Sequence, residues 1–446
     1  MLKALGSTFK IRDLRNKILF TLGLIFVYRI GAFIPTPGID GQALSLYFKK
    51  ISETAGGTLF GIMNLFTGGA MQKMTVFGLG IMPYISASII MQLLTAVVPG
   101  LEKLAKEPNG RQKITQYTRY ATVAICLIQS FFFSLWLENP AHFQGLLIVS
   151  SPGWGFRFLA VLTLTTGTMF IMWLGEMITA KGIGNGISLI ITANIISRIP
   201  AAFDSLFVML APFNPENRQL EPLTLVIMVV MLVLVIISVI LITQGQRKIP
   251  IQYAKRVVGR KVYGGQSTYI PLRVNTAGVI PIIFAQALLM FPATIAAVVP
   301  SQAFKTVASW LTTGVLYTIF YSLLIIFFSY FYTAIVFNPH DVADNMKRYG
   351  GFVPGVRPGK PTAEYFDYIM GRITLPGAIF LAIIAVLPSF VSRGLRIPQL
   401  VASFFGGTGI LIIVGVMLDT MRQIESQLLM RHYEGFMKKG RLRGRR

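Results

Sequence analysis

Gly80-Ile81-Met82-Pro83-Tyr84-Ile85-Ser86-Ala87 recurs in the second half of the chain as Gly278-Val279-Ile280-Pro281-Ile282-Ile283-Phe284-Ala285. The glycine, the proline, the isoleucine in sixth place and the final alanine are the same, and each copy opens a long apolar segment. A second pair follows in the same order, because Gly184-Asn185-Gly186-Ile187 and Gly407-Thr408-Gly409-Ile410 each lead into another apolar segment. Interrupted apolar segments at matching positions of two halves are typical of transport proteins whose site lies at the repeat interface. One pair alone could be coincidence, but two in one order predict a duplicated membrane protein.

The composition also indicates a membrane protein. The 446 residues are 54% hydrophobic and only 13% charged, and their mean hydropathy is +0.64, which lies outside the range of soluble domains. Apolar runs of about 20 residues, the length of a helix that crosses ~30 Å of hydrocarbon, recur along the chain. We predict ten transmembrane helices, at 18–36, 76–98, 119–137, 157–178, 185–203, 223–243, 276–299, 313–336, 374–391 and 402–420. An even number of spans places both termini on the same side of the membrane.

The basic residues predict the orientation. The sequence has 41 lysines and arginines against 17 acidic residues. Most of the basic residues fall before the first span, in the second, sixth and eighth connections, and after the last span. The positive-inside rule makes this face cytoplasmic, so we expect a protein of the cytoplasmic (inner) membrane with both termini inside. The first span is too long for a signal peptide and lacks a small-residue cleavage pattern, so we expect it to be retained.

No catalytic, metal or cofactor site is predicted. The only cysteine, Cys126, lies inside a span and is most simply a small core residue. The three histidines, His142, His340 and His432, are scattered over connections and tail, which does not favour a metal site. A phosphate-binding loop is also missing, because the upstream glycine spacing of that motif is absent. We therefore do not expect an enzyme.

The spans contain almost none of the ionisable residues that form relays in ion-coupled transporters. Arg29, Glu176 and Asp419 lie toward the ends of spans, where a charged head group can reach water. With no energy source in the sequence, we expect a passive conduit that another protein drives.

Two long basic connections differ from the short external ones. Residues 244–275 mix β-branched and aromatic residues with charges, which favours a β-hairpin. Residues 337–373 contain several Pro and Gly pairs, which set turns. The charge alone would suit contact with anionic lipids, but the length and turn pattern favour a docking surface for a large cytoplasmic partner, for which ribosomal RNA is one candidate.

The stretch before the second span, 58–70, is apolar on one side and ends in the pair Gly68-Gly69. It is too short to cross a bilayer, and irregular backbone at membrane depth requires a protein interior or a wet cavity. A re-entrant half-helix in a pore mouth would meet that requirement. A helix lying on the outer leaflet is the alternative that periodicity leaves open.

These features resemble the SecY family of protein-conducting channels along essentially the whole sequence. The residues that carry the resemblance are 28–31 with 34–38, 80–90, 116–120, 182–188, 253–256, 337–339 and 352–359. The resemblance implies an all-α membrane protein of two five-helix inverted-repeat halves around an hourglass pore. Residues 1–215 would hold spans one to five, 216–422 spans six to ten, and 423–446 a basic cytoplasmic tail.

The resemblance also implies roles for individual residues. The stretch 58–74 would be a plug, with Phe60, Gly61, Ile62, Met63, Asn64, Leu65, Phe66, Thr67, Gly68 and Gly69 at its centre. A pore ring would consist of Ile81, Ile85, Ile187, Ile191, Ile283 and Ile412. A lateral gate, between spans two and three and spans seven and eight, would include the polar residues Ser86, Gln92, Gln129, Asn275 and Gln286. The residues that bind partners would be Arg247, Lys248, Lys255, Arg256, Arg260, Lys261 and Arg357.

The function implied is passage of unfolded preproteins across the membrane and lateral release of hydrophobic segments into it. The partners implied are the SecE and SecG membrane subunits, the SecA ATPase, the ribosome, signal peptides and preproteins. A substrate-specific secondary transporter is the leading rival, and a lipid scramblase or insertase is third. The transporter would require charged or strongly polar residues at mid-membrane, which the sequence lacks.

Overall fold

The computed structural model describes residues 11–54, 64, 66–143, 145–210, 221–253, 256–258, 261–263, 267–298, 314–395, 401–402, 404 and 407–439. In the first half the elements are α2 (Arg12–Gly31), α3 (Gly41–Thr54), α5 (Met82–Val97), α6 (Pro99–Lys106), α7 (Gly110–Glu138), η1 (Pro140–Phe143), α8 (Trp154–Lys181), α9 (Gly186–Ser197) and α10 (Ile199–Leu210). In the second half they are α11 (Pro222–Gln244), β1 (Gln246–Tyr253), β2 (Arg256–Val258), β3 (Lys261–Tyr263), β4 (Ser267–Arg273), α12 (Ile280–Val298), α14 (Gly314–Val336), α15 (Pro339–Arg348), β5 (Gly351–Phe352), α16 (Lys360–Leu395) and α18 (Thr408–Lys439).

A helix overlaps each of the ten predicted spans, so the ten-helix plan agrees with the structure. Six described segments are long and apolar enough to cross a membrane by themselves: Gly110–Glu138, Trp154–Lys181, Gly186–Leu210, Pro222–Gln244, Gly314–Arg348 and Lys360–Ser392. Helices α5 and α6 make a seventh if they are counted as one span bent by 99°. Helices α2 and α18 fall outside this group because each carries several charged residues. Helix α18 also continues to Lys439, so much of the predicted tail is helical.

The repeated octapeptide has the same backbone turn in both halves. Gly80 has a φ of 61° and Gly278 a φ of 62°, a conformation that glycine adopts without steric cost. Each turn leads into a helix with proline in second place, at Pro83 in α5 and Pro281 in α12, where the missing N–H is not needed. The first sequence echo therefore reflects a structural repeat.

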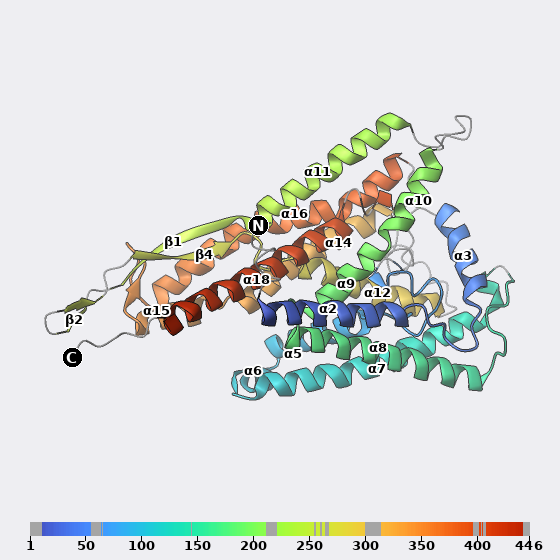
Figure 1. Ribbon diagram of the computed structural model, residues 1–446, viewed down its shortest axis with the longest axis horizontal. Coiled ribbons are helices and arrows are strands. Elements are labelled where there is room, and N and C mark those ends of the chain that lie inside the picture. Colours follow the sequence, from blue (N-terminus) through green and yellow to red (C-terminus); the bar gives the residue numbers. More distant parts are fainter. Residues whose placement is uncertain are drawn as a thin grey trace.

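The two halves share one apolar core. Helices α2, α7 and α8 lie on one side of the molecule and α11, α14, α16 and α18 on the other, with α9 and α10 between them (Figure 1). Helix α12 contacts both α5 and α7, and α9 contacts α18, so helices from both halves meet directly. A single cluster of buried apolar side chains extends through these contacts.

The predicted hairpin in 244–275 is present. Strand β1 pairs antiparallel with β4, from Gln246 opposite Arg273 to Gln252 opposite Ser267, and β2 pairs with β3 beyond it. The short strand β5 adds to the other edge of β1, which joins the two basic connections in one sheet of order β4-β1-β5. We call the end of the molecule that carries this sheet the ribbon end, and the opposite end the α3 end (Figure 1).

The sheet has a small core of its own. Ile249, Ile251 and Leu272 pack against Phe366 and Ile369 of α16, and all five side chains are buried. This cluster is separate from the main core. The ribbon end is therefore a packed unit rather than a set of free loops.

Candidate pore, plug and side gate

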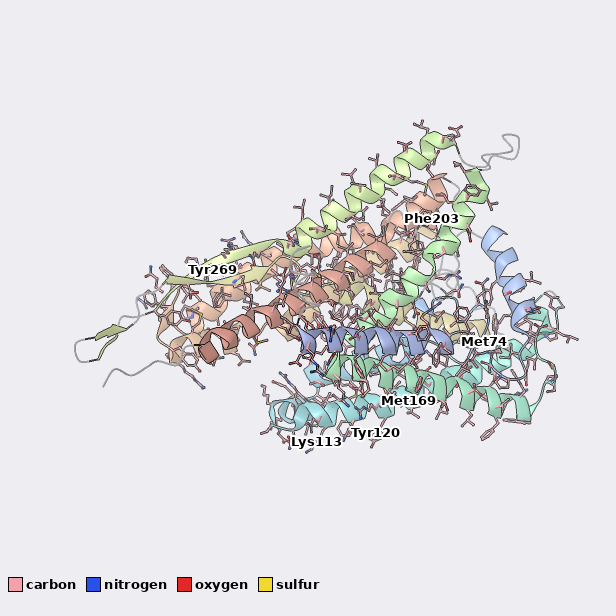
Figure 2. The ribbon with its side chains drawn as sticks, viewed as in Figure 1. Met74, Lys113, Tyr120, Met169, Phe203 and Tyr269 are labelled. Carbon is pink, nitrogen blue, oxygen red and sulfur yellow. The ribbon has the colours of Figure 1, made fainter. Side chains whose placement is uncertain are left out.

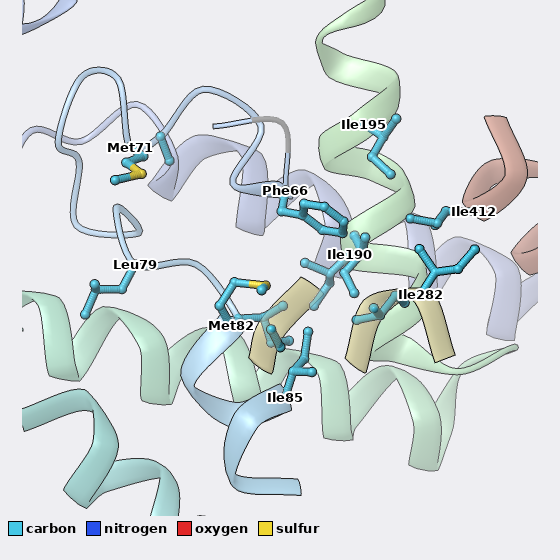
Figure 3. Packing of buried hydrophobic residues seen from close by; sticks show 14 of the residues in the cluster. Phe66, Met71, Leu79, Met82, Ile85, Ile190, Ile195, Ile282 and Ile412 are labelled. Atoms are coloured by element: carbon cyan, nitrogen blue, oxygen red, sulfur yellow. The ribbon is translucent and has the colours of Figure 1, made fainter. Parts of the chain in front are cut away.

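The predicted ring isoleucines come together in the interior. Ile81, Ile85, Ile191, Ile283 and Ile412 are each at most 5% exposed and belong to the main apolar cluster. Ile187, the sixth, is partly buried and packs against the same cluster. Figure 3 shows side chains from α5, α9, α12 and α18 converging, with Ile85, Ile190, Ile282 and Ile412 around one point. Ile190 and Ile282 were not predicted, and both are fully buried.

These side chains converge because all four helices begin near this point. Ile85 and Ile283 take the same place after the repeated turn. At the start of α9, the Oδ1 atom of Asn185 accepts hydrogen bonds from the N–H groups of Ile187, at 3.1 Å, and Ser188, at 3.2 Å. Such an N-cap fixes the first turn of a helix. A ring built on helix starts is thus held by turn and cap geometry in addition to packing.

The predicted plug is described at Asn64 and from Phe66 onward, whereas Phe60, Gly61, Ile62, Met63 and Leu65 lie outside the described residues. Phe66 is 2% exposed and Thr67 1% exposed. Phe66 lies directly beside Ile190 in Figure 3. For this part of the stretch, a helix on the membrane surface is wrong, because the side chains are enclosed by protein.

Polar contacts fix the turn at residues 66–72 on both sides, and we call this segment the plug turn after its predicted role. The Nδ2 atom of Asn64 donates to Oε1 of Gln72 at 3.1 Å, and the N–H of Gln72 donates back to Oδ1 of Asn64 at 3.2 Å. On the other side, Nδ2 of Asn194 donates to the carbonyl oxygen of Phe66 at 2.7 Å. The plug turn is therefore bonded to its own following loop and to α9.

The structure corrects the interpretation of Arg29. Its Nη1 atom is buried and has no hydrogen-bond partner, so this head group does not simply extend to water. The other two ionisable residues are paired, since Glu176 accepts from Arg119 at 2.7 and 3.0 Å, and Asp419 lies 3.7 Å from Arg422. Arg29 is the exception because it faces the plug turn.

Of the five predicted gate residues, Gln286 alone is fully buried, at 5% exposure, and its Oε1 atom has no donor. Asn275 donates to the carbonyl oxygen of Gly278 at 3.1 Å, and Gln92 donates to Ser88 at 3.1 Å. Both bonds are local to one half. Ser86 and Gln129 are half-buried. The seam itself is covered, because α12 packs on α5 and α7.

The predicted partner-binding residues lie at the ribbon end. Arg247 and Lys248 are exposed on β1, and Arg357 is exposed in the turn before α16. The Nζ atom of Lys248 lies 4.7 Å from the ring centre of Tyr269, which Figure 2 shows on the ribbon. Arg256 and Lys261 lie on β2 and β3, whereas Lys255 and Arg260 lie outside the described residues. Within the part of the chain that the structure describes, no group of three His, Cys, Asp or Glu side chains could hold a metal ion.

Sequence reasoning missed Asn194 and Arg198. Asn194 lies on α9, and Arg198 is the residue that caps the C-terminus of that helix, so the four-residue spacing places both on the same side. An amide and a guanidinium at this spacing, in a predicted span whose other polar side chains are small hydroxyls and the capping Asn185, were the available signal.

Similarity to known proteins agrees with this architecture. The sequence matches the profile of the SecY family over residues 75–421. It is 46% identical over 443 residues to the protein translocase subunit SecY of Escherichia coli (strain K12), covering 97% of this chain and 96% of that protein. It is 47% identical over 450 residues to the protein translocase subunit SecY of Streptomyces coelicolor, covering 98% of this chain and all of that protein.

Solved structures show the same fold. A structure described as that of a protein-conducting channel superimposes with a TM-score of 0.64 at 17% identity, covering 92% of this chain and 91% of that one. Sec61 in a canine ribosome–channel complex from the endoplasmic reticulum gives a TM-score of 0.60 at 16% identity, with 92% and 91% covered.

Fold and site together define a multi-pass membrane protein of two repeated halves that meet at a buried apolar cluster. The sequence matches make the assignment specific: the chain belongs to the SecY family.

Proposed function

We propose that this chain forms the channel of a protein translocase, in which unfolded preproteins cross the membrane and hydrophobic segments leave sideways into the lipid. The observation that carries the proposal is that Ile85 and Ile283, which take the same place after a repeated turn, are both buried in one apolar cluster that also contains Phe66 of the predicted plug. Residues 1–215 and 216–422 would be the two halves, and 423–446 the cytoplasmic tail. The names of the related proteins support this function.

The resting state would be sealed by dewetting. A narrow ring of apolar side chains excludes water and therefore ions. The isoleucines offer no hydrogen-bond donor or acceptor, so an extended chain of any sequence can slide past them. Phe66 would close the passage on one side by filling the space beside the ring.

Opening would follow from a shift between two populated states. A hydrophobic signal segment that enters between α5 with α7 and α12 with α14 would replace contacts between helices by contacts of its own. The signal segment shifts the equilibrium between the closed and open states only to the extent that it binds the open state more tightly than the closed state. Gln286, buried with an unpaired Oε1, would be a weak point of this seam.

The ribbon end would receive the driving partner. In this proposal it faces the cytoplasm of the cell, and the membrane is the cytoplasmic (inner) membrane. The exposed basic residues of β1 and of the Arg357 turn would bind the SecA motor or a ribosome, anionic lipids would surround the same face, and SecE and SecG would be the membrane partners. The ribosome complexes of Sec61 and of yeast Ssh1, which share this fold, support a ribosome as partner.

Reconstitution tests the proposal. The purified chain, with its membrane subunits, is placed in liposomes and supplied with a preprotein, the motor ATPase and ATP. Protease-protected preprotein is the expected result. Uptake of a small solute under an ion gradient, without preprotein uptake, would instead identify a secondary transporter.

A further inference from the structure

The Gly68–Gly69 turn rests on polar side chains that the proposed mechanism has not used. A Cβ atom on Gly68 would lie 2.7 Å from Oδ1 of Asn194 and 2.9 Å from Nη1 of Arg29. One on Gly69 would lie 3.1 Å from Nη1 of Arg198. Both glycines have positive φ, 64° and 91°, which allows the backbone this close approach.

Asn194 stabilises the turn in this position. Its side chain is 1% exposed, and its Nδ2 donates to the Phe66 carbonyl at 2.7 Å. Departure of the turn would leave this buried amide without an acceptor until water enters, which is unfavourable. Asn194 also lies on α9, the helix that carries Ile187 and Ile191 of the ring, so the bond joins the turn directly to the ring.

The two arginines act against the turn. One nitrogen of each, Nη1 of Arg29 and Nε of Arg198, is buried without a hydrogen-bond partner, although both residues are partly exposed. Among the described residues neither arginine has an acidic partner within ion-pair distance, and the positive charge of Arg29 acts on Arg198. Buried unpaired charges are unfavourable, and like charges repel more strongly where water is excluded. If the turn moved away, water could also reach these two buried nitrogen atoms.

We propose that Asn194 is the positioning residue that holds the plug turn in the closed state of the channel. We propose also that Arg29 and Arg198 oppose this bond, so that the closed state is only slightly more stable than the open one. The inference rests on the proposed channel function, because it concerns the movement of the plug. It predicts effects of opposite sign from Asn194 and Arg198, which are four residues apart at the C-terminal end of α9.

The test is the conductance of the idle channel in planar bilayers, with the full chain and its membrane subunits. Asn194→Leu removes the donor and should raise the ratio of open to closed channels about two- to tenfold, the worth of one hydrogen bond. Thr192→Val is the matched control, because Thr192 is also buried on α9 but donates to the carbonyl of Ser188 in its own helix, at 2.8 Å. It should leave conductance unchanged. Arg198→Met, which keeps the apolar stem but removes the charge, should lower idle conductance below that of the wild type.

A second variant reaches the turn without altering the polar group. Gly68→Ala places a methyl group against Asn194 and Arg29 and should raise conductance like Asn194→Leu. Gly23→Ala, where a Cβ would meet nothing within 4 Å, is its control. Unchanged conductance in both Asn194→Leu and Gly68→Ala would overturn the inference, and so would a rise in conductance with Arg198→Met. Preprotein uptake by the wild-type protein is measured in parallel, because its absence would refute the channel function itself rather than the role of Asn194.

Discussion

In the apolar cluster that contains Phe66, isoleucine side chains from four helices are at most a few per cent exposed. At the ribbon end, by contrast, arginine and lysine side chains are exposed on a sheet with its own small core. The first region is apolar apart from a few polar side chains, and Asn194, Arg29 and Arg198 lie against its turn. The second presents charge to water on a rigid support. The comparison indicates that sealing and docking are separate properties of this chain, and that substitutions should affect one without the other.

The strongest test of the sealed region replaces Ile85 and Ile283 together with Asn. Each change removes apolar burial of about 1.5–3 kcal/mol and adds a polar group whose unsatisfied burial costs about 1–3 kcal/mol. Water can solvate the new groups in the open state, so the ratio of open to closed channels should rise at least tenfold. Idle conductance in planar bilayers measures this. The double Ala variant should leak less, because it widens the ring without adding a hydrogen-bonding group.

Phe66→Ala should have the next largest effect. Removing a buried phenylalanine costs about 3–5 kcal/mol, and here the loss should fall mainly on the closed state. We expect a leaking channel that also exports preproteins with defective signal sequences. Phe143→Ala is the matched control, because Phe143 is equally buried but packs on Tyr47 and Trp136 at the α3 end.

The control should lower the melting temperature without raising conductance. If Phe66→Ala instead behaved like Phe143→Ala, Phe66 would be an ordinary core residue. Deletion of residues 60–70 is a coarser test of the same assignment. If the deletion abolished assembly in the membrane, that stretch would be a structural element rather than a plug.

Arg357→Glu tests the docking region. Arg357 is exposed, and its carbonyl accepts from Oγ1 of Thr362 at 2.8 Å, so the turn should persist after the charge changes. Reversal of a docking charge places like charges together and costs several kcal/mol. Motor-driven preprotein transport should fall at least tenfold while idle conductance stays unchanged. Asp204→Lys, a reversal of an exposed charge on α10 away from the ribbon end (Figure 1), should leave transport near normal. A full transport rate with Arg357→Glu would remove Arg357 from the docking surface.

The repeated octapeptide explains why part of the candidate site could be predicted from the sequence. Ile85 and Ile283 share one place in an octapeptide whose glycines proved to have φ values of 61° and 62°, so a local pattern was enough to find them. The pairing of β5 with β1, at Gln252 opposite Phe352, was not predicted because two residues of strand have no periodicity. Arg29 was misread for a related reason: its position in a helix does not reveal that a turn from another segment covers it.

The smallest expected effect comes from comparing the two repeated glycines. Alanine at either position must adopt a positive φ, which costs about 1–2 kcal/mol. At Gly278 the nearest atom to the new Cβ is Oδ2 of Asp419 at 4.0 Å, but at Gly80 it is Cγ2 of Thr67 at 2.9 Å. Gly80→Ala therefore pushes on the plug turn in addition to straining the backbone, and Gly278→Ala does only the latter. We expect similar losses of thermal stability in the two variants and a two- to threefold rise in idle conductance with Gly80→Ala alone. Equal conductance in the two variants would show that Thr67 yields without moving the turn, and that the plug turn is not coupled to the repeat.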